Sequence, residues 1–186
     1  HLRVCGILNN DVERILFTKE RLAEKVKFLA NELKHEYEGK NPLILCILKG
    51  SLIFTADLMR ELDFPCTVDF MQASSYGSGA ETSGTLKIKK DTDEDIKGRH
   101  VIIVEDILDT GVTLARLMDV LKNRGAASLS LCVLLNKPAR RTERVSADYI
   151  GFDIENEFVV GYGLDYNEKY RNLPYVGILK REIYEK

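Results

Sequence analysis

The sequence lacks any apolar run close to the roughly 20 residues needed to cross a bilayer, and it shows no signal-peptide pattern. Acidic and basic residues nearly cancel, 29 against 27, so the strong positive field of nucleic-acid-binding and membrane-surface proteins is also missing. No internal repeat, linker or low-complexity tract is visible. We therefore expect a soluble, cytoplasmic protein that binds neither nucleic acid nor membrane.

The four cysteines form no framework either. Cys46 and Cys132 lie inside apolar runs, whereas Cys5 and Cys66 stand alone, and no pair has the spacing of a zinc site. A free cysteine in an apolar run behaves as a small hydrophobe. We expect Cys46 and Cys132 to be buried and assign no chemistry to any of the four.

Two widespread phosphate-binding motifs are absent as well. The sequence contains no Gly-x-x-x-x-Gly-Lys-Ser/Thr loop of the nucleoside triphosphatases. It also contains no Gly-x-Gly-x-x-Gly turn directly after a strand, which is the mark of dinucleotide-binding proteins. The sequence therefore argues against a P-loop NTPase.

What is present indicates one globular domain over residues 1–186, because 45% of the residues are hydrophobic and 30% are charged. Helical spacing of apolar residues predicts helices over 18–37, 52–62 and 114–124. Apolar or β-branched runs predict strands over 43–48, 66–71, 101–104, 129–135, 149–152, 158–160 and 175–179. This alternation predicts an α/β fold, with a mostly parallel central sheet and helices on both of its faces.

The most informative stretch covers residues 101–114. Its first four residues are apolar and β-branched and predict a buried strand that ends at Glu105 and Asp106. These adjacent carboxylates would repel a phosphate, but they suit ribose hydroxyls or a magnesium ion that itself carries phosphate. Asp109 follows in a turn, where its carboxylate is free to accept a proton.

The turn over residues 109–113 leads directly into a predicted helix. Backbone N–H groups at a helix start, with the hydroxyls of Thr110 and Thr113 beside them, make a site for a phosphate dianion. A lone Asp-Thr-Gly would be better explained as a helix cap, but a strand, two acids, a turn and a helix in succession are more specific. We predict that the phosphate is bound by Asp109, Thr110, Gly111, Val112 and Thr113.

This stretch resembles the phosphoribosyl pyrophosphate (PRPP) motif of the type I phosphoribosyltransferases. Further segments resemble the branch of that family that acts on 6-oxopurines, and they occur in the same order. They are a pyrophosphate loop at 48–51, the start of a flexible loop at 74–77, a base-reading lysine segment at 136–138, and a purine-binding hood at 158–166 with Arg171 after it. The resemblance covers nearly the whole chain beyond the first predicted helix.

The resemblance implies a function, purine salvage. The enzyme would transfer the phosphoribosyl group of PRPP to hypoxanthine or guanine, with xanthine also open, and would give IMP or GMP and pyrophosphate. It also implies magnesium as cofactor, a homodimer or homotetramer, a flexible active-site loop over about 74–86, and a small hood subdomain from about 149–186 with N-terminal residues.

In this resemblance the pyrophosphate is held by Lys49, by the backbone of Gly50 and Ser51, and by Arg171. Arginine suits this role because its planar fork engages two oxygens at once.

The metal and the closing loop are also assigned by resemblance. Glu105, Asp106 and Asp165 would contact the magnesium ion, which bridges the protein, the ribose hydroxyls and the pyrophosphate. Ser75 and Tyr76 would fold over the site and exclude water that could hydrolyse the reactive sugar.

Base recognition would fall to Lys137, Phe158, Val159 and Asp165. Lys137 can donate to a 6-oxo group but would meet the amino group of adenine donor to donor. Phe158 can stack on a purine, and Asp109 would take the proton of the imidazole ring. Taken alone, Phe158 would be a core aromatic and Lys137 a solvated strand end; the five matching segments together outweigh those readings.

Other readings remain. A regulator that kept the PRPP fold, lost catalysis and binds nucleic acid should have a basic face, an added domain or a missing catalytic group. This chain has a net charge of −2 and keeps Asp109, Lys137, Phe158 and Asp165. A transferase for adenine, orotate or uracil is the other alternative, against which the Lys137 and Phe158 segments argue.

Three positions depart from the family pattern. Val112 stands where some relatives carry lysine, Ser51 stands where many carry glycine, and Gly163 adds freedom within the hood. These departures bear on affinity and base preference more than on the type of reaction.

Overall fold

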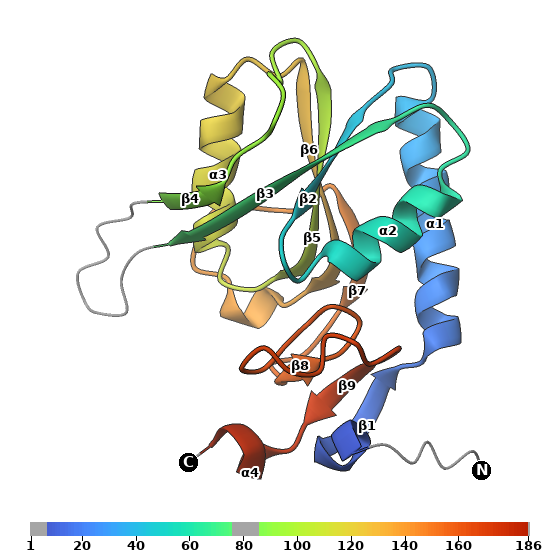
Figure 1. Cartoon of the computed structure of the whole chain (residues 1–186), viewed down its shortest axis with the longest axis vertical. Coiled ribbons are helices and arrows are strands. Elements are labelled where there is room, and N and C mark those ends of the chain that lie inside the picture. Colours follow the sequence, from blue (N-terminus) through green and yellow to red (C-terminus); the bar gives the residue numbers. More distant parts are fainter. Residues whose placement is uncertain (1–6, 76–85, 186) are drawn as a thin grey trace.

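The computed structural model describes residues 7–75 and 86–185 (Figure 1). Its elements, in chain order, are the 3₁₀ helix η1 (Ile7–Asp11), β1 (Val12–Phe17), α1 (Lys19–Tyr37), β2 (Leu43–Ile47), α2 (Leu52–Glu61), β3 (Thr67–Ser75), β4 (Leu86–Lys90), β5 (His100–Leu108), α3 (Val112–Asn123), β6 (Ser128–Asn136), the 3₁₀ helix η2 (Pro138–Arg140), β7 (Tyr149–Asp153), β8 (Val159–Val160), β9 (Val176–Leu179) and α4 (Arg181–Tyr184). No helix among these residues is long and apolar enough to span a bilayer.

The main sheet has the strand order β4-β3-β2-β5-β6-β7. Strands β3, β2, β5, β6 and β7 run parallel, and β4 pairs antiparallel at one edge. Ile102 packs in the apolar cluster that includes α1 and α2, whereas Ile103, the next residue, packs in the cluster that includes α3. A sheet covered on both faces needs such continuous apolar runs. The predicted α/β fold with helices on both faces is confirmed.

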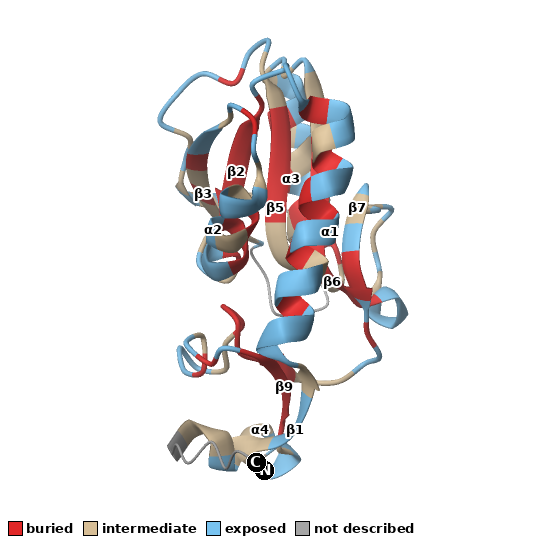
Figure 2. Ribbon diagram, turned by 90° about the vertical axis from the view of Figure 1, so that its right-hand side faces the viewer, coloured by how far each residue is buried: buried red, intermediate tan, exposed pale blue. Residues whose placement is uncertain are grey.

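Helix α1 illustrates how closely local sequence predicts local structure. Thr18 caps it, since its Oγ1 accepts a hydrogen bond from the N–H of Arg21 at 3.3 Å. Its buried residues form one stripe that faces the sheet (Figure 2): Leu22, Val26, Leu29, Ala30, Leu33 and Tyr37. Cys46 and Cys132 are also buried, as expected, and burial raises the pKa of the Cys132 thiol to about 12.

A second sheet, of order β1-β9-β8, is antiparallel and lies beside the carboxyl ends of the main strands (Figure 1). We call β1 and residues 158–184, which include β8, β9 and α4, the hood. The expected start of the hood at about residue 149 was too early, because β7 pairs with β6 in the main sheet. The hood packs on the main body through a stack of Phe17 on Phe152, with ring centroids 3.9 Å apart, and through the Tyr162 hydroxyl, which donates to Asp57 of α2. The hood therefore brings both ends of the described chain to one edge of the main sheet.

We expected the central strand to end at Glu105 and Asp106, and this was wrong. Strand β5 continues to Leu108, because pairing with β6 continues as far as Leu108 opposite Asn136. The loop expected from Ser74 was also wrong at its start, since β3 runs to Ser75 and pairs with β4. Strand β4 alternates half-buried and exposed residues at the sheet edge, and its exposed residues are Lys87 and Lys89. A strand with three lysines among five residues shows no apolar run in the sequence. The rest of that expected loop lies outside the described residues.

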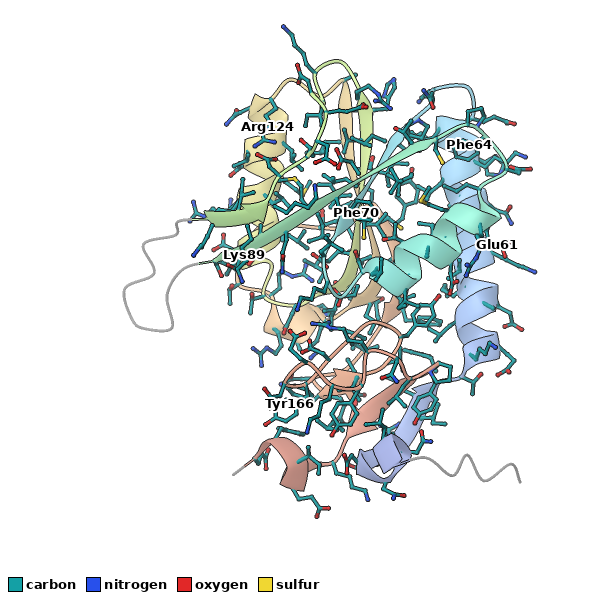
Figure 3. All side chains as sticks on the ribbon, in the orientation of Figure 1. Glu61, Phe64, Phe70, Lys89, Arg124 and Tyr166 are labelled. Atoms are coloured by element: carbon teal, nitrogen blue, oxygen red, sulfur yellow. The ribbon has the colours of Figure 1, made fainter. Side chains whose placement is uncertain are left out.

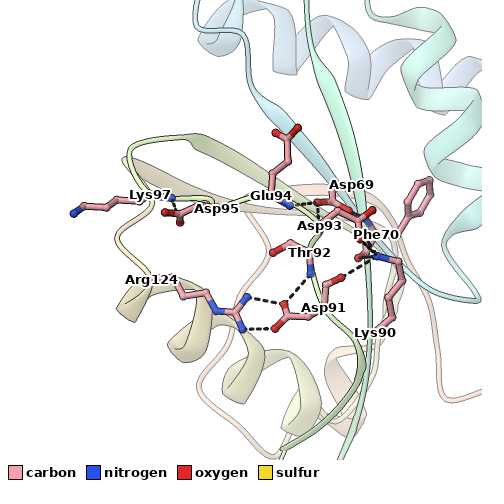
Figure 4. A network of polar contacts seen from close by, with 10 residues as sticks. All are labelled: Asp69, Phe70, Lys90, Asp91, Thr92, Asp93, Glu94, Asp95, Lys97 and Arg124. Carbon is pink, nitrogen blue, oxygen red and sulfur yellow. Dashed lines mark hydrogen bonds and ion pairs between the residues drawn. The ribbon is translucent and has the colours of Figure 1, made fainter.

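A polar network ties α3 to the β3–β4 hairpin (Figure 4). Arg124, which follows the last turn of α3, donates to both carboxylate oxygens of Asp91 at 2.6 and 2.7 Å. The buried Asp69 of β3 accepts from the backbone N–H groups of Phe70 and Asp93. Planar two-point pairs of this kind fix orientation as well as distance. The network therefore helps to set the position of α3, whose first turn lies at the candidate site.

Candidate active site

The candidate site lies where the two central strands of the main sheet end. From β2 the chain passes to β3 on one side, and from β5 it passes to β6 on the other side. Loops that follow such neighbouring strands diverge and leave a crevice between them, and ligands bind there in open α/β sheets. Here the loops are Leu48–Ser51 after β2 and the turn 109–113 after β5, and the hood faces both (Figure 1).

The loop after β2 is in close contact with β5 and with the hood. A Cβ on Gly50 would lie 1.8 Å from Oδ2 of Asp106, so any larger residue at position 50 would force the Asp106 carboxylate to move. On its other side, the carbonyl oxygen of Gly50 lies against Gly163 of the hood. Ser51 turns inward, since its buried hydroxyl donates to the carbonyl of Ile47 at 2.7 Å. The peptide bond between Leu48 and Lys49 is cis.

Two cations from different elements meet beside this loop. Lys49 forms an ion pair with Glu168 of the hood at 2.9 Å. Arg171 contacts Asp165 at 3.2 Å and Glu168 at 3.4 Å, and one of its terminal nitrogens donates to the carbonyl of Gly163 at 2.8 Å. Its Nε is buried and has no hydrogen-bond partner among the described residues. Arg171 thus keeps a donor available.

The two adjacent carboxylates of β5 lie behind the Gly50 loop. Burial raises the pKa of Glu105 well above its usual range, and the nearby charge of Asp106 raises it further. The backbone N–H of Ile107 donates to Asp106 at 2.9 Å. Among the residues that the structure describes, no group of three His, Cys, Asp or Glu side chains is arranged to hold a metal ion. The carboxylates therefore do not form a complete metal cage by themselves.

The turn over residues 109–113, which we call the phosphate turn after its predicted role, is built around Gly111. This glycine has φ = 83°, and a Cβ on it would lie 2.4 Å from Cγ1 of Val145. Helix α3 begins at the next residue, and its first backbone bond runs from the N–H of Ala115 to Gly111 at 2.8 Å. The N–H groups before Ala115 are those that a helix leaves without intrahelical partners. The Thr113 hydroxyl lies 3.4 Å from that of Ser75, so the end of β3 adjoins the turn.

One residue that sequence reasoning missed, Arg141, holds this turn in place. Its guanidinium donates to the carbonyls of Leu108, Asp109 and Val145 at 2.8 to 3.1 Å and to the side chain of Asn136 at 2.7 Å. All three of its nitrogens are engaged. In the sequence Arg141 is one of two neighbouring arginines, and nothing local separates its role from that of a solvated surface residue.

A cavity of about 590 Å³ opens between the end of β5, the lysine segment after β6 and the hood. Its walls include each residue predicted to contact a base together with the predicted proton acceptor: Asp109, Lys137, Phe158, Val159 and Asp165. Figure 3 labels Tyr166 among the side chains of the hood. Asp106 lines the same cavity and also lies against Gly50, so the cavity adjoins the loop after β2.

Lys137 and Asp109 face this cavity from neighbouring strands. Lys137 is almost fully buried and its Nζ donates to the carbonyl of Glu157 at 2.9 Å. Burial lowers the pKa of Lys137, and the Asp109 carboxylate opposes that effect. Asp109 is paired with Arg140, whose Nε lies 3.1 Å from Oδ1, yet this buried oxygen accepts no hydrogen bond from the described residues.

The hood side of the cavity is aromatic. Tyr184 of α4 stacks on Phe158, with ring centroids 4.7 Å apart and planes at 22°, and Tyr166 meets the Phe158 ring edge-on at 5.6 Å. Arg181 of α4 lines the cavity as well. Sequence reasoning missed α4 and both of its cavity residues, because a four-residue helix leaves no periodic pattern.

The structure thus gathers nearly all of the predicted site residues at one edge of the main sheet. Lys49, Gly50 and Arg171 surround one part, the phosphate turn forms a second, and the base cavity forms a third. The Ser51 hydroxyl bonds to the carbonyl of Ile47, so only the backbone of Ser51 remains for ligand binding. Tyr76 lies outside the described residues, so its predicted closing role stays a prediction.

Comparison with known proteins gives consistent matches. A family model described as a phosphoribosyl transferase domain matches residues 14–167. The chain is 51% identical over 180 residues to a hypoxanthine-guanine phosphoribosyltransferase of Streptococcus thermophilus, a match that covers 97% of this chain and 100% of that protein.

It is also 51% identical over 177 residues to a bifunctional TilS/HprT protein of Listeria innocua, and there the match covers 95% of this chain but spans 27% of the relative's length. A crystal structure of a hypoxanthine phosphoribosyltransferase from Staphylococcus aureus superposes with a TM-score of 0.95 at 43% identity, over 98% of this chain and 100% of that one.

Proposed function

Because this chain belongs to the phosphoribosyltransferase family, we propose that it is a purine-salvage enzyme that transfers the phosphoribosyl group of PRPP to hypoxanthine or guanine and releases pyrophosphate. One observation carries the proposal. The phosphate turn and a cavity with a buried lysine share Asp109, so a sugar phosphate and a flat base bound to them would meet beside a carboxylate.

PRPP would bind at two places. Its 5′-phosphate would lie in the phosphate turn, on the free N–H groups at the start of α3 and the hydroxyls of Thr110 and Thr113. Its pyrophosphate would lie beside Gly50, on Lys49 and Arg171, since the buried Nε of Arg171 has no hydrogen-bond partner among the described residues. This arrangement would place the anomeric carbon between the two anion sites, at the mouth of the base cavity.

Magnesium fits the carboxylates of the site. Mg²⁺ is usually bound by one or two carboxylates and by substrate phosphates rather than by a cage made of protein alone. The absence of a three-ligand group among the described residues agrees with this. One or two of Glu105, Asp106 and Asp165 would hold the ion, and the ribose hydroxyls and the pyrophosphate would supply its other ligands; the remaining carboxylates would bind those hydroxyls directly. The ion would supply positive charge to the leaving pyrophosphate.

The base would lie against Phe158, with its 6-oxo group on Lys137. A buried ammonium that meets an amino group would lose its hydrogen bond, so adenine should be rejected. As a purine ring nitrogen bonds to the anomeric carbon, the bond from that carbon to pyrophosphate breaks. The proton of the opposite imidazole nitrogen would pass to Asp109, whose Oδ1 accepts no other hydrogen bond from the described residues.

Ser75 supports the closing role proposed for the loop after β3. Its hydroxyl lies 3.4 Å from that of Thr113 in the phosphate turn, so the chain that follows it starts beside the site. A cover over this edge would exclude the water that could otherwise attack the activated sugar.

The deciding experiment incubates the protein with PRPP, Mg²⁺ and one base at a time, and follows pyrophosphate release and nucleotide formation. We expect turnover with hypoxanthine, guanine or both, xanthine as a third candidate, and none with adenine, orotate or uracil. If PRPP binds but no base is converted, the chain is a binding protein, and the alternative of a regulator without catalysis is supported. Turnover with adenine would overturn the role of Lys137.

A further inference from the structure

A tight turn in the hood holds Glu168 in a conformation that suits glycine. Tyr166 and Lys169 exchange two backbone hydrogen bonds, at 3.0 and 3.2 Å, around Asn167 and Glu168. Both central residues have positive φ, 51° and 61°. Two-residue turns of this form favour Asn followed by Gly, because a Cβ is disfavoured in the left-handed region. A glutamate at this position therefore strains the backbone. The contacts of the Glu168 side chain should show what offsets that strain.

The Glu168 carboxylate lies between two cations of the candidate site. One oxygen is 2.9 Å from Nζ of Lys49, and the other is 3.4 Å from a terminal nitrogen of Arg171. The Glu168 backbone N–H donates to Asp165 at 2.9 Å, which anchors the turn beside the same arginine. Lys49 is the first cause of the lowered pKa of Glu168. A single carboxylate thus bridges the β2 loop and the hood.

These ion pairs are poorly suited to stabilising the fold. The side chains of Lys49 and Glu168 are 54% and 64% exposed, and solvent screens such pairs strongly. Exposed pairs exchange partners readily, and a multiply charged anion would attract the same cations more strongly than one carboxylate does. The position of the Glu168 carboxylate is therefore better explained by reversible binding to the two cations than by a role in stabilising the fold.

We infer that Glu168 is a built-in competitor of the pyrophosphate group for Lys49 and Arg171, which weakens binding of that anion and speeds its departure as product. This rests on the proposed function, in which the same two cations bind the pyrophosphate. The carboxylate takes over the cations as the product leaves, so the charges of the site are never left unpaired. PRPP is bound more weakly for the same reason.

The test is calorimetric binding of Mg²⁺-pyrophosphate and of PRPP to the wild-type chain and to Glu168→Gln, which removes the charge at nearly constant size. We expect both ligands to bind tighter, by about two- to thirtyfold, as two exposed pairs of ordinary strength would give. The gain should shrink in high salt. Glu24→Gln, at an exposed position of α1, is the matched control for net charge and should change neither affinity.

The outcomes separate the two proposals. If the wild-type chain binds neither PRPP nor pyrophosphate, the proposed function fails. If it binds both while Glu168→Gln binds them equally or more weakly, Glu168 is not a competitor and only this inference falls. Equal tightening in Glu24→Gln would also overturn it, because the effect would then be one of net charge. Should Glu168→Gln fold poorly, Glu168→Gly, which suits the turn, gives the same comparison.

Discussion

The phosphate turn and the hood face each other across the candidate site, yet they are built in different ways. The turn is one continuous segment between β5 and α3, and its shape follows from Gly111 and from the helix start. The hood joins distant parts of the chain, since Val12 of β1 pairs with Leu179 of β9. A contiguous motif fixes the order and spacing of its own binding groups, even where a distant residue such as Arg141 braces it, whereas an assembled surface depends on separate contacts for each of its groups. Changes in the turn should therefore cause larger losses than changes in the hood.

The largest loss should follow Asp109→Asn, at the start of the turn. The variant keeps the size of the side chain but removes the proposed proton acceptor from the cavity that holds Lys137 and Phe158. A general base typically contributes about 10²–10⁴-fold, so kcat should fall by that factor in steady-state assays while PRPP affinity stays similar. Glu105→Gln and Asp106→Asn are the comparison, because they should act mainly on PRPP and magnesium binding. Near-normal kcat in Asp109→Asn would mean that the proton leaves by another route.

The next effect concerns what holds the turn. Arg141→Gln removes four hydrogen bonds that a part-buried guanidinium makes around Leu108 and Asp109. Hydrogen bonds to a charged group contribute about 1.5–3 kcal/mol each and are not additive, so we expect unfolding to become easier by about 3–5 kcal/mol. The loss should appear as a lower Tm in thermal unfolding and as weaker PRPP binding.

Arg140→Gln is the matched control for that variant in stability, because Arg140 is half exposed and its side chain makes one ion pair among the described residues, with Asp109. Its stability loss should stay below about 1 kcal/mol. Equal destabilisation of the two variants would show that Arg141 is not what fixes the turn.

The same contrast explains what the sequence could predict. The apolar run before Glu105, the turn and the helix after it are local, and their existence and order were predicted, although the end of β5 was not. That end depends on how far β6 continues beside it, as far as Asn136, which no local pattern in β5 reveals. Strands β1 and β4 were missed because charged residues interrupt their apolar pattern.

The site residues divide in the same way. Lys137 and Phe158 were found through resemblance to a family and not through spacing, because each alone reads as an ordinary residue. Arg141 and Tyr184 were missed, since their roles depend on partners far along the chain, at Leu108 and Phe158. Tertiary contacts of this kind are what a single sequence conceals.

Lys137 joins the two regions and should give an intermediate effect. It follows β6 in the main sheet, and its ammonium bonds to Glu157 at the entry to the hood. Lys137→Met keeps the aliphatic stem and removes a charged hydrogen-bond donor, so kcat/KM for hypoxanthine should fall by about 10–150-fold with PRPP affinity unchanged. Discrimination against adenine should weaken in the same assay. Wild-type kinetics with hypoxanthine would show that another group reads the base.

The smallest effect should come from the hood, at Tyr184. Its ring stacks on Phe158 and so supports the aromatic wall of the base cavity without belonging to the turn or to the sheet. Aromatic pairs contribute about 0.5–1.5 kcal/mol beyond the area that they bury, so Tyr184→Ala should raise the KM for the base by about two- to tenfold. Because the ring stacks on Phe158 and belongs to neither the phosphate turn nor the Lys49–Arg171 site, kcat and PRPP affinity should hardly change. Tyr184→Phe keeps the stack and should behave as wild type. If Tyr184→Ala instead lowered the KM for the base, Tyr184 would be an occupant of the base position and not its support, and the hood would act on the site by exclusion.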